Sequence, residues 1–366
     1  MTPDVSFPDG KIILGLESSC DETAAAVVVG GRDVRSNVIA TQDDLHAAYA
    51  GVVPEIASRA HLERLLPVVE QSLEESGTRL GELDAIAVGH RPGLIGSLLV
   101  GVSAAKALAW SLGVPVIGVD HVHAHLYGGL LAEGDDAPPT PEMPALGLVV
   151  SGGHTNLYRV TDPLGIELLG RTIDDAIGEA FDKAATILDL GYPGGPRIDA
   201  IAAGGNDRAY DLPIARLDRD SLDFSFSGLK TALLYAVRGR PAAGQRAVAR
   251  GPLNLDERQK ADFAASFQRS AVAAVMLKLE RCRERHPDAR SLLVGGGVCA
   301  NRRLRAELAE WCASKALDLR IPPPRLCLDN AAMIAGLAAW RLRAGDVDDL
   351  SLAAAARSAP PARRTG

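Results

Sequence analysis

A pattern of three short strands followed by a long helix occurs twice in this chain, and this duplication constrains the fold most strongly. Each predicted strand is rich in β-branched and apolar residues, and polar or glycine turns separate the strands, as in a β-meander. The duplication predicts an α/β protein with two similar lobes and a cleft between them. The predicted strands are KIILGLE, AAAVVVG and DVRSNVIA in the first half and ALGLVVS, TNLYRV and IELLGR in the second.

The length of 366 residues exceeds what one hydrophobic core usually holds, so two domains are expected. Residues 133–144 carry four prolines and no apolar period, which predicts a connecting loop. We therefore assign residues 1–132 to a first lobe and residues 145–344 to a second. The tail at 345–366 is biased toward Ala, Arg and Pro and is predicted to be disordered.

Apolar residues recurring every three or four positions predict the amphipathic helices of both lobes. Over 238–254, glycine, proline and arginine interrupt every such period, which predicts a loop. The predicted helices cover 54–76, 95–112, 174–190, 256–286, 301–314 and 329–343, and further strands are predicted at DAIAVG, VPVIGV, RSLLVGG and LDLRIP.

The composition is that of a soluble globular protein, with 47% hydrophobic and 23% charged residues. A net charge of −7 argues against a protein that coats nucleic acid indiscriminately, so any such contact should be local. The five cysteines form no CxxC pair, which fits a reducing compartment. With no export signal and no uncharged apolar window of membrane-spanning length, we expect a cytoplasmic protein without membrane contact.

Three of the eight histidines lie within the five residues HVHAH, directly after an apolar strand. On a helix, the imidazoles of His121 and His125 project from one face and can share a metal ion, whereas His123 points elsewhere. A carboxylate from Asp329 would complete a site of two histidines and one carboxylate. The alternatives are an exposed turn for the histidines and a helix N-cap for Asp329.

Two glycine-rich loops, each after a predicted strand, have the composition of anion-binding loops. Gly152 and Gly153 allow the backbone to approach a ligand closely and to direct its N–H groups inward. The string LLVGGGVCANRRL places a helix N-terminus beside Asn301, which suits a nucleotide. Tight turns and close strand-to-helix contacts are the alternative, and with both loops in one chain we favour ligand binding.

Carboxylates lie beside two of the predicted turns. The turn YPGGP can fold back to bring Asp182 and Asp199 near one ligand, where carboxylates suit the hydroxyls of a ribose. Asp21 and Glu22 follow the first strand, and the duplication directs their turn toward the cleft. The alternatives are a solvated charged face for the first pair and local turn hydrogen bonds for the second.

Many separate strings, in one order along the chain, resemble a single family. From about Ile12 to Ala339 the sequence closely resembles the tRNA N6-adenosine threonylcarbamoyltransferases, called TsaD in bacteria. The resemblance implies the two-lobed fold of actin, sugar kinases and chaperone ATPases (ASKHA), in agreement with the duplication. The strings are ESSCDET, PGLIGSLLVG, HVHAH, VVSGGHT, RTIDDAIGEAFDK, YPGGP, FSFSGLKTAL, GGGVCANRRLR and LDNAAMIAG.

The resemblance also implies roles for individual residues. His121, His125 and Asp329 match the family's ligands for one divalent metal ion per subunit, with iron(II) as the first choice and zinc as the second. Asp21 and Glu22 are the candidates for proton transfer or for positioning the amine. The positions that match substrate contacts are Val149, Val150, Ser151, Gly152, Gly153, Asp182, Gly195, Asp199 and Asn301.

The implied reaction transfers the threonylcarbamoyl group of L-threonylcarbamoyladenylate to the N6 amine of the adenosine 3′-adjacent to the anticodon, in tRNAs reading codons that begin with A. The expected partners are tRNA, an inactive paralogue (TsaB) and a small ATPase (TsaE). The adenylate is an already activated anhydride, so the enzyme must supply placement, charge stabilisation and a path for the amine proton. Arg302, Arg303 and Arg305 either contact tRNA phosphates or form the solvated face of their helix.

The residues alone leave two other classes of enzyme possible. An ATP-dependent kinase or ATPase of the same fold would use the same phosphate loops. A metallopeptidase would use the HxxxH pair, but the general base that follows the first histidine in HExxH peptidases is replaced by Val122. The chain departs from the usual family pattern at Arg91, where glycine is common, and at His123-Ala124, where Glu-Gly is common.

Overall fold

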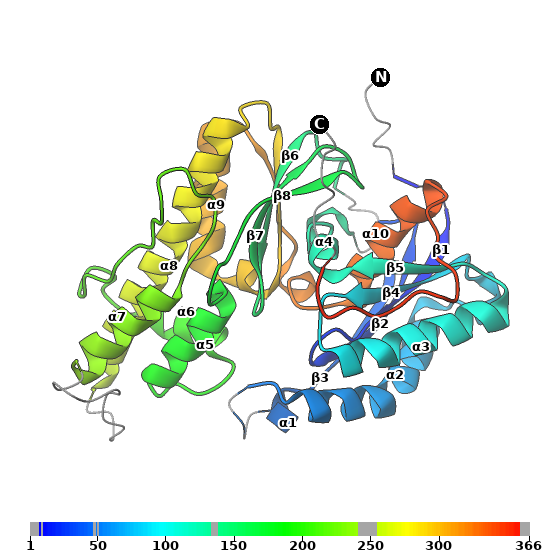
Figure 1. Cartoon of the computed structure of the whole chain (residues 1–366), viewed down its shortest axis with the longest axis horizontal. Helices are drawn as coiled ribbons and strands as arrows, with labels where there is room; N and C mark the ends of the chain where they lie inside the picture. Colours follow the sequence, from blue (N-terminus) through cyan, green and yellow to red (C-terminus); the bar gives the residue numbers. More distant parts are fainter. Residues whose placement is uncertain are drawn as a thin grey trace.

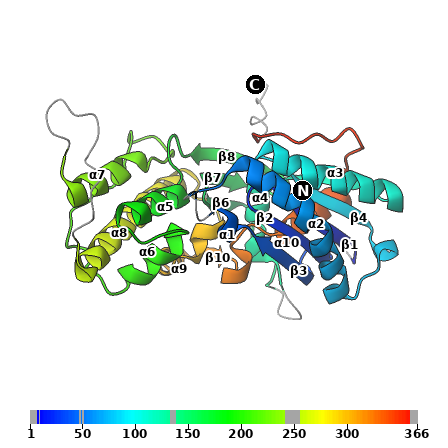
Figure 2. The ribbon, with the colours of Figure 1, turned by 90° about the horizontal axis from the view of Figure 1, so that it is seen from below.

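The computed structural model of this protein describes residues 7–8, 10–46, 49, 51–132, 138–240 and 255–358. It shows two α/β lobes that lie side by side, each with its own sheet and its own layer of helices (Figures 1 and 2). Part of the predicted connecting loop and most of the predicted loop at 238–254 lie outside the described residues.

The first lobe contains a five-stranded mixed sheet whose order is β3-β2-β1-β4-β5. The first three strands form the predicted antiparallel meander, and the last two add in parallel beside β1. The strands are β1 (Ile12–Glu17), β2 (Glu22–Val29), β3 (Asp33–Thr41), β4 (Ala85–Arg91) and β5 (Val116–Asp120).

The second lobe repeats this arrangement in a sheet of order β10-β9-β6-β7-β8. Again three strands form an antiparallel meander, and two parallel strands follow beside the first strand of the meander. The predicted duplication is therefore confirmed. The strands are β6 (Ala145–Val150), β7 (Thr155–Val160), β8 (Ile166–Arg171), β9 (Ser291–Gly295) and β10 (Asp318–Arg320).

Two long helices cover the first sheet over the predicted ranges, α2 (Pro54–Ser76) and α3 (Ile95–Leu112). Proline is favoured in the first helical turn, and α2 ends at Gly77, whose φ of 63° suits a residue without Cβ. By length and composition α3 would suffice to cross a membrane. It nevertheless packs against β4 and α2, as a core helix does, with Leu98 and Val102 buried.

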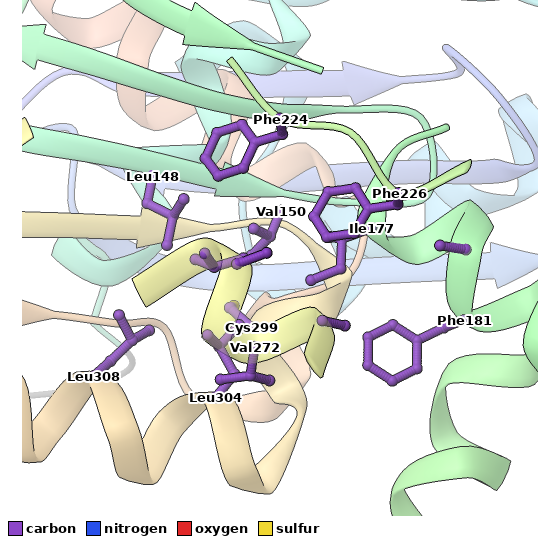
Figure 3. Close-up of a cluster of buried hydrophobic side chains, with 14 of the residues drawn as sticks. Leu148, Val150, Ile177, Phe181, Phe224, Phe226, Val272, Cys299, Leu304 and Leu308 are labelled. Carbon is purple, nitrogen blue, oxygen red and sulfur yellow. The ribbon is translucent and has the colours of Figure 1, made fainter. Parts of the chain in front are cut away.

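The second sheet is covered by helices that enclose the largest hydrophobic core (Figure 3). Side chains from β6, α5 and α9 meet there, and burying each such aliphatic or phenyl group contributes about 1.5–3 kcal/mol. The helices are α5 (Ile177–Ile187), α6 (Gly194–Ala202), α7 (Ser227–Arg238), α8 (Glu257–Arg285) and α9 (Arg302–Lys315). Short elements elsewhere are α1 (Asp43–His46), α4 (His121–His125), η2 (Leu80–Glu82), η3 (Gly128–Leu130), η4 (Gly297–Ala300) and η5 (Pro324–Leu326).

The last helix, α10 (Ala331–Arg343), differs from the domain assignment made on the sequence. It packs against β1, β2 and β4 of the first sheet, so this part of residues 145–344 belongs with the first lobe (Figure 1). The approach to β1 is very close, because a Cβ on Gly15 would overlap the carbonyl oxygen of Ala331. The fold thereby carries a segment from the far end of the chain back to the first lobe.

The tail corrects a second expectation, since residues 345–358 are not disordered but run over the first lobe. The Asp348 carboxylate accepts a hydrogen bond from the amide of Gly118 at 2.8 Å, and Leu352 is buried in the core between the sheet and its two long helices. The amide of Ala355 donates to the carbonyl of His90 at 2.9 Å. Composition missed this segment because a few specific contacts, rather than an apolar period, hold it.

Candidate active site

The histidine pair lies at the end of the parallel strand β5. Asp120, the last residue of β5, accepts hydrogen bonds through Oδ1 from the amides of Val122 at 3.1 Å and His123 at 3.4 Å, which caps the short helix α4. The rings of His121 and His125 then lie on one face with centroids 4.7 Å apart. Both rings are buried, as a shared site requires.

Asp329 completes this group from the far end of the chain. Its Oδ2 lies 3.5 Å from Nε2 of His121, and its Oδ1 lies 3.2 Å from Nε2 of His125. The alternative role of N-cap is wrong, because Asn330 caps α10 by accepting from the amide of Met333 at 3.0 Å. The cap on the next residue leaves the Asp329 carboxylate directed at the two histidines.

The donor atoms fit a divalent metal ion. One ligand atom from each of His121, His125 and Asp329 lies within 4.8 Å of the others. The buried Nε2 of His125 makes no hydrogen bond of acceptable geometry, although a carboxylate oxygen is near, as expected when both atoms face a common cation. Two imidazole nitrogens and one carboxylate oxygen suit iron(II) or zinc.

The electrostatics of the cluster follow from its close packing. Although burial lowers the pKa of His121, the carboxylates of Asp329 and Glu17 outweigh this and raise it to about 10. Burial likewise opposes ionisation of Asp329, but the two imidazoles hold its pKa well below the usual range. The charged carboxylate is therefore the form that faces the histidines.

The turn after β1 brings the two predicted catalytic carboxylates to the same place. Burial raises the pKa of Glu22, and the carboxylates of Asp329 and Asp21 raise it further. Burial also raises the pKa of Asp182 in the second lobe, and the charge of Asp21 adds to that effect. The charge of Asp21, in the turn between β1 and β2, thus acts on a carboxylate of each lobe, and the direction of this turn toward a shared cleft stays a prediction.

The corresponding turn of the second lobe presents backbone rather than charge. The Ser151 amide donates to the carbonyl of His154 at 2.8 Å, and Ser151 Oγ accepts from the His154 amide at 3.1 Å. Gly152 and Gly153 are exposed, and no protein atom lies within 4 Å of the place where their Cβ would be. The side chains of Val149 and Val150 are buried in the core, so only their backbone can meet a ligand.

The sequence interpretation assigned no role to His154 or Glu17. Burial, with the charges of His121 and His125, lowers the pKa of His154 to about 4. Glu17 has no exposed surface, and its Oε2 lies 3.0 Å from Nδ1 of His121. Glu17 lies in the string ESSCDET and His154 lies in VVSGGHT. The sequence signal that could have identified Glu17 is a carboxylate at the end of an apolar strand.

The turn YPGGP folds back onto Asp182, while a ligand shared by Asp182 and Asp199 stays a prediction. Asp182 accepts through Oδ1 from the Gly194 amide at 2.7 Å, at the start of α6, and the face of Gly195 is open. One turn further, Asp199 binds Nε of Arg302 at 2.7 Å. A pocket of about 340 Å³ lies beside this pair, lined by Asp199, Ala202, Ala203, Gln268, Arg302 and Arg303.

Asn301 is held by the chain itself. Its Oδ1 accepts from the Leu304 amide at 3.0 Å, which caps α9, and its Nδ2 donates to Gln268 of the pocket at 2.8 Å. The arginines that follow it are also engaged: Arg303 pairs with Asp207, and Arg305 donates to the carbonyl of Pro322. The arginines are therefore engaged within the protein and are not simply a solvated face, while contact with tRNA phosphates stays a prediction.

Comparison with known proteins gives a consistent result. The family model for TsaD, described as tRNA N6-adenosine threonylcarbamoyltransferase, matches residues 33–336. Relatives of that description from Symbiobacterium thermophilum and Rhodopirellula baltica are 50% and 46% identical, over 93% of this chain and 94% of each relative.

Solved structures agree on the fold at low sequence identity. Full-length HypF in its phosphate- and nucleotide-bound form aligns with a TM-score of 0.57 at 14% identity, over 94% of this chain and 57% of HypF. Component A of (R)-2-hydroxyglutaryl-CoA dehydratase from Acidaminococcus fermentans aligns with a TM-score of 0.50 at 12% identity, over 91% of this chain and 99% of that protein.

Proposed function

Because this chain belongs to the family of tRNA N6-adenosine threonylcarbamoyltransferases, we infer that its active site is the cleft where the two polar turns meet the histidine cluster. The chain forms N6-threonylcarbamoyladenosine in tRNA by threonylcarbamoyl transfer, on the ASKHA fold. The observation that carries the site is the convergence of His121, His125 and Asp329 beside Glu22. Family membership decides against the kinase and the metallopeptidase.

His121, His125 and Asp329 would hold one divalent ion, with iron(II) preferred and zinc as the second choice. When bound, such an ion supplies a Lewis acid for a carbonyl or phosphate oxygen. The chain's own contribution is a buried and closely spaced set of donors, which needs little rearrangement on binding. Metal analysis of protein purified without added metal, together with reconstitution by each ion, tests the choice.

The second lobe supplies the seat for L-threonylcarbamoyladenylate in this proposal. The exposed backbone at Gly152 and Gly153 can donate N–H groups to the anionic part of the adenylate. The pocket beside Asp199 is large enough to receive its nucleoside part. Asp182 holds the first turn of α6 in place and keeps the face of Gly195 open to the cleft.

The first lobe handles the proton of the incoming amine. The N6 amine of the tRNA adenosine attacks the carbonyl carbon, the new C–N bond forms, and the bond from that carbon to the phosphate oxygen breaks to release AMP. Glu22 accepts the proton that the amine loses, because burial raises the pKa of this carboxylate and improves it as a base. Asp21, beside it, helps to orient the amine.

A reconstituted reaction tests this function directly. The purified chain, the TsaB-like and TsaE-like partners and unmodified tRNA are supplied with preformed adenylate, and the tRNA is digested and searched for the modified nucleoside by mass spectrometry. We expect the threonylcarbamoyl group on the adenosine 3′-adjacent to the anticodon. Failure to modify that nucleoside, with every partner shown to be folded and the adenylate intact, would contradict the proposal.

A docking surface for the TsaB-like partner is proposed on α2 and α3, which pack side by side. Leu62 and Leu66 on α2 are 67% and 61% exposed, and Leu99 on α3 is 51% exposed. Exposed apolar side chains that gather on adjacent helices mark a protein–protein interaction surface. A Leu62→Glu, Leu66→Glu double variant should lose the complex with the paralogue in size-exclusion chromatography. We place this assembly in the cytoplasm.

A further inference from the structure

We propose that Glu17 is a positioning residue that holds His121 in the tautomer and orientation needed to bind a metal ion. The proposal rests on the metal centre inferred above and adds a residue to it. Glu17 is the last residue of β1, whereas the ligands come from α4 and from the segment before α10. Glu17 would act through the imidazole of His121 and would not contact the substrate.

The contacts of the Glu17 carboxylate carry the argument. Oε2 lies 3.0 Å from Nδ1 of His121, and Oε1 accepts from the amide of Ser19 at 2.6 Å. The hydroxyl of Ser19 also lies 3.2 Å from the same Nδ1. With Nδ1–H donated to Oε2, Nε2 is the nitrogen left for a metal ion, which would replace its proton on the side where Asp329 stands 3.5 Å away.

The burial of Glu17 points the same way. The side chain has no exposed surface, and a polar group so buried is costly unless hydrogen bonds satisfy it. The contacts of its two oxygens are the amide of Ser19 and the imidazole of His121. A carboxylate that binds one nitrogen of an imidazole in this way fixes the orientation of the ring and leaves the other nitrogen for a metal ion.

The neighbouring strand leaves room for this one carboxylate. β1 and β4 run parallel with Leu16 beside Val88, which brings Gly89 next to Glu17. A Cβ on Gly89 would lie 2.6 Å from Oε2 of Glu17, so any side chain there would displace the carboxylate from His121. Position 89 therefore offers a second way to disturb the contact without substituting Glu17 or His121.

The test measures zinc affinity by chelator competition for the wild type, Glu17→Gln and Gly89→Ala, with Glu75→Gln on the exposed side of α2 as the matched control. Loss of a carboxylate that supports a ligating imidazole typically weakens metal binding by about 10–100-fold. We expect that loss in both Glu17→Gln and Gly89→Ala, and none in the control. Thermal unfolding of the metal-free proteins shows which variants are folded.

Nitrogen-15 NMR of the zinc-loaded wild type provides a readout that needs no variant. Nδ1 of His121 should carry the proton and Nε2 the metal, and the opposite assignment would overturn the proposal. Affinities of folded Glu17→Gln and Gly89→Ala within twofold of the wild type would also overturn it. If His125→Ala binds zinc as tightly as the wild type, the metal centre itself fails, which is a separate result.

Discussion

The turns that follow β1 and β6 occupy equivalent places in two similar sheets, yet they differ in chemistry. In the first lobe the turn carries Asp21, which is buried, and leads into Glu22, which is half-buried. In the second lobe it carries Gly152 and Gly153, which are exposed. The comparison teaches that the duplicated sheet decides where a turn lies, while its residues decide whether it offers charged side chains or backbone N–H groups.

The last helix makes the two lobes unequal in a second way. α10 leaves the second lobe and packs on the first sheet, so the first lobe gains Asp329 in addition to its own two histidines. The charged chemistry is thereby concentrated in the first lobe. If the first lobe carries the charged groups of catalysis, its variants should lose more activity than variants of the second lobe.

Loss of a metal ligand in the first lobe should have the largest effect. His125→Gln should lower kcat by about 10³-fold, because a Lewis acid contributes several kcal/mol to the transition state. His123→Gln, two residues away on the same helix but outside the ligand group, should retain activity within a few fold. Transfer assays with metal analysis check both variants. Equal losses of kcat in the two variants would contradict the assignment of His125, and not His123, to the metal site.

Removal of the proposed proton acceptor should rank next. Glu22→Gln should lower kcat by about 10²-fold at nearly unchanged KM, the usual contribution of a general base. The control is Glu179→Gln in the second lobe, whose carboxylate pairs with Lys183 on the surface of α5. Steady-state kinetics with preformed adenylate distinguish them; a Glu22→Gln variant with full kcat would remove the acid–base role from the first lobe.

The contact between β1 and α10 should matter more for stability than its counterpart in the second sheet. Gly15→Ala would press a methyl group into the backbone of Ala331 and should cost about 2 kcal/mol. Gly147→Ala meets mainly the flexible end of Leu126 at 3.0 Å and should cost less than about 1 kcal/mol. Urea unfolding compares the two, and the reverse order would contradict the close packing of α10.

The glycine turn of the second lobe should affect binding rather than chemistry. Gly152→Ala adds a methyl group in space that the protein leaves open, so the free energy of unfolding should stay near that of the wild type. KM for the adenylate should rise by about tenfold, equivalent to roughly 1.4 kcal/mol, with little change in kcat. An unchanged KM would mean that the backbone of this turn does not hold the adenylate.

The last effect concerns pH, and it comes from the buried amine of Lys278 in the second lobe. Burial lowers the pKa of Lys278 to about 8, even though its amine donates to the carbonyls of Arg216 and Ser221. Between pH 8 and about 10 the unfolded chain, with a lysine pKa near 10.4, therefore binds more protons than the folded protein.

Stability should consequently rise with pH over that window, by about 1 kcal/mol per pH unit at most. Lys278→Met removes the titrating group and should flatten this slope in urea unfolding measured at several pH values. A wild-type slope that is flat, or that falls as the pH rises, would contradict the lowered pKa.

Much of the fold was open to prediction from local pattern. The ranges of α2 and α3 follow from apolar periods together with the proline and glycine at the ends of α2, all of which are local signals. The five-residue helix at His121 and the cap on Asn330 were harder, because single side-chain hydrogen bonds decide them. The tail at 345–358 was missed for the same reason.

The sequence by itself determined the duplicated sheets, the histidine pair and the motif set of the family, since each depends on residues close together in the chain. Only the tertiary structure decided that Glu17 lies against His121, that α10 packs on the first lobe, and that Arg302 is bound to Asp199. Such contacts join residues more than a hundred positions apart. Their geometry is set by how the lobes and helices pack, and no local pattern encodes it.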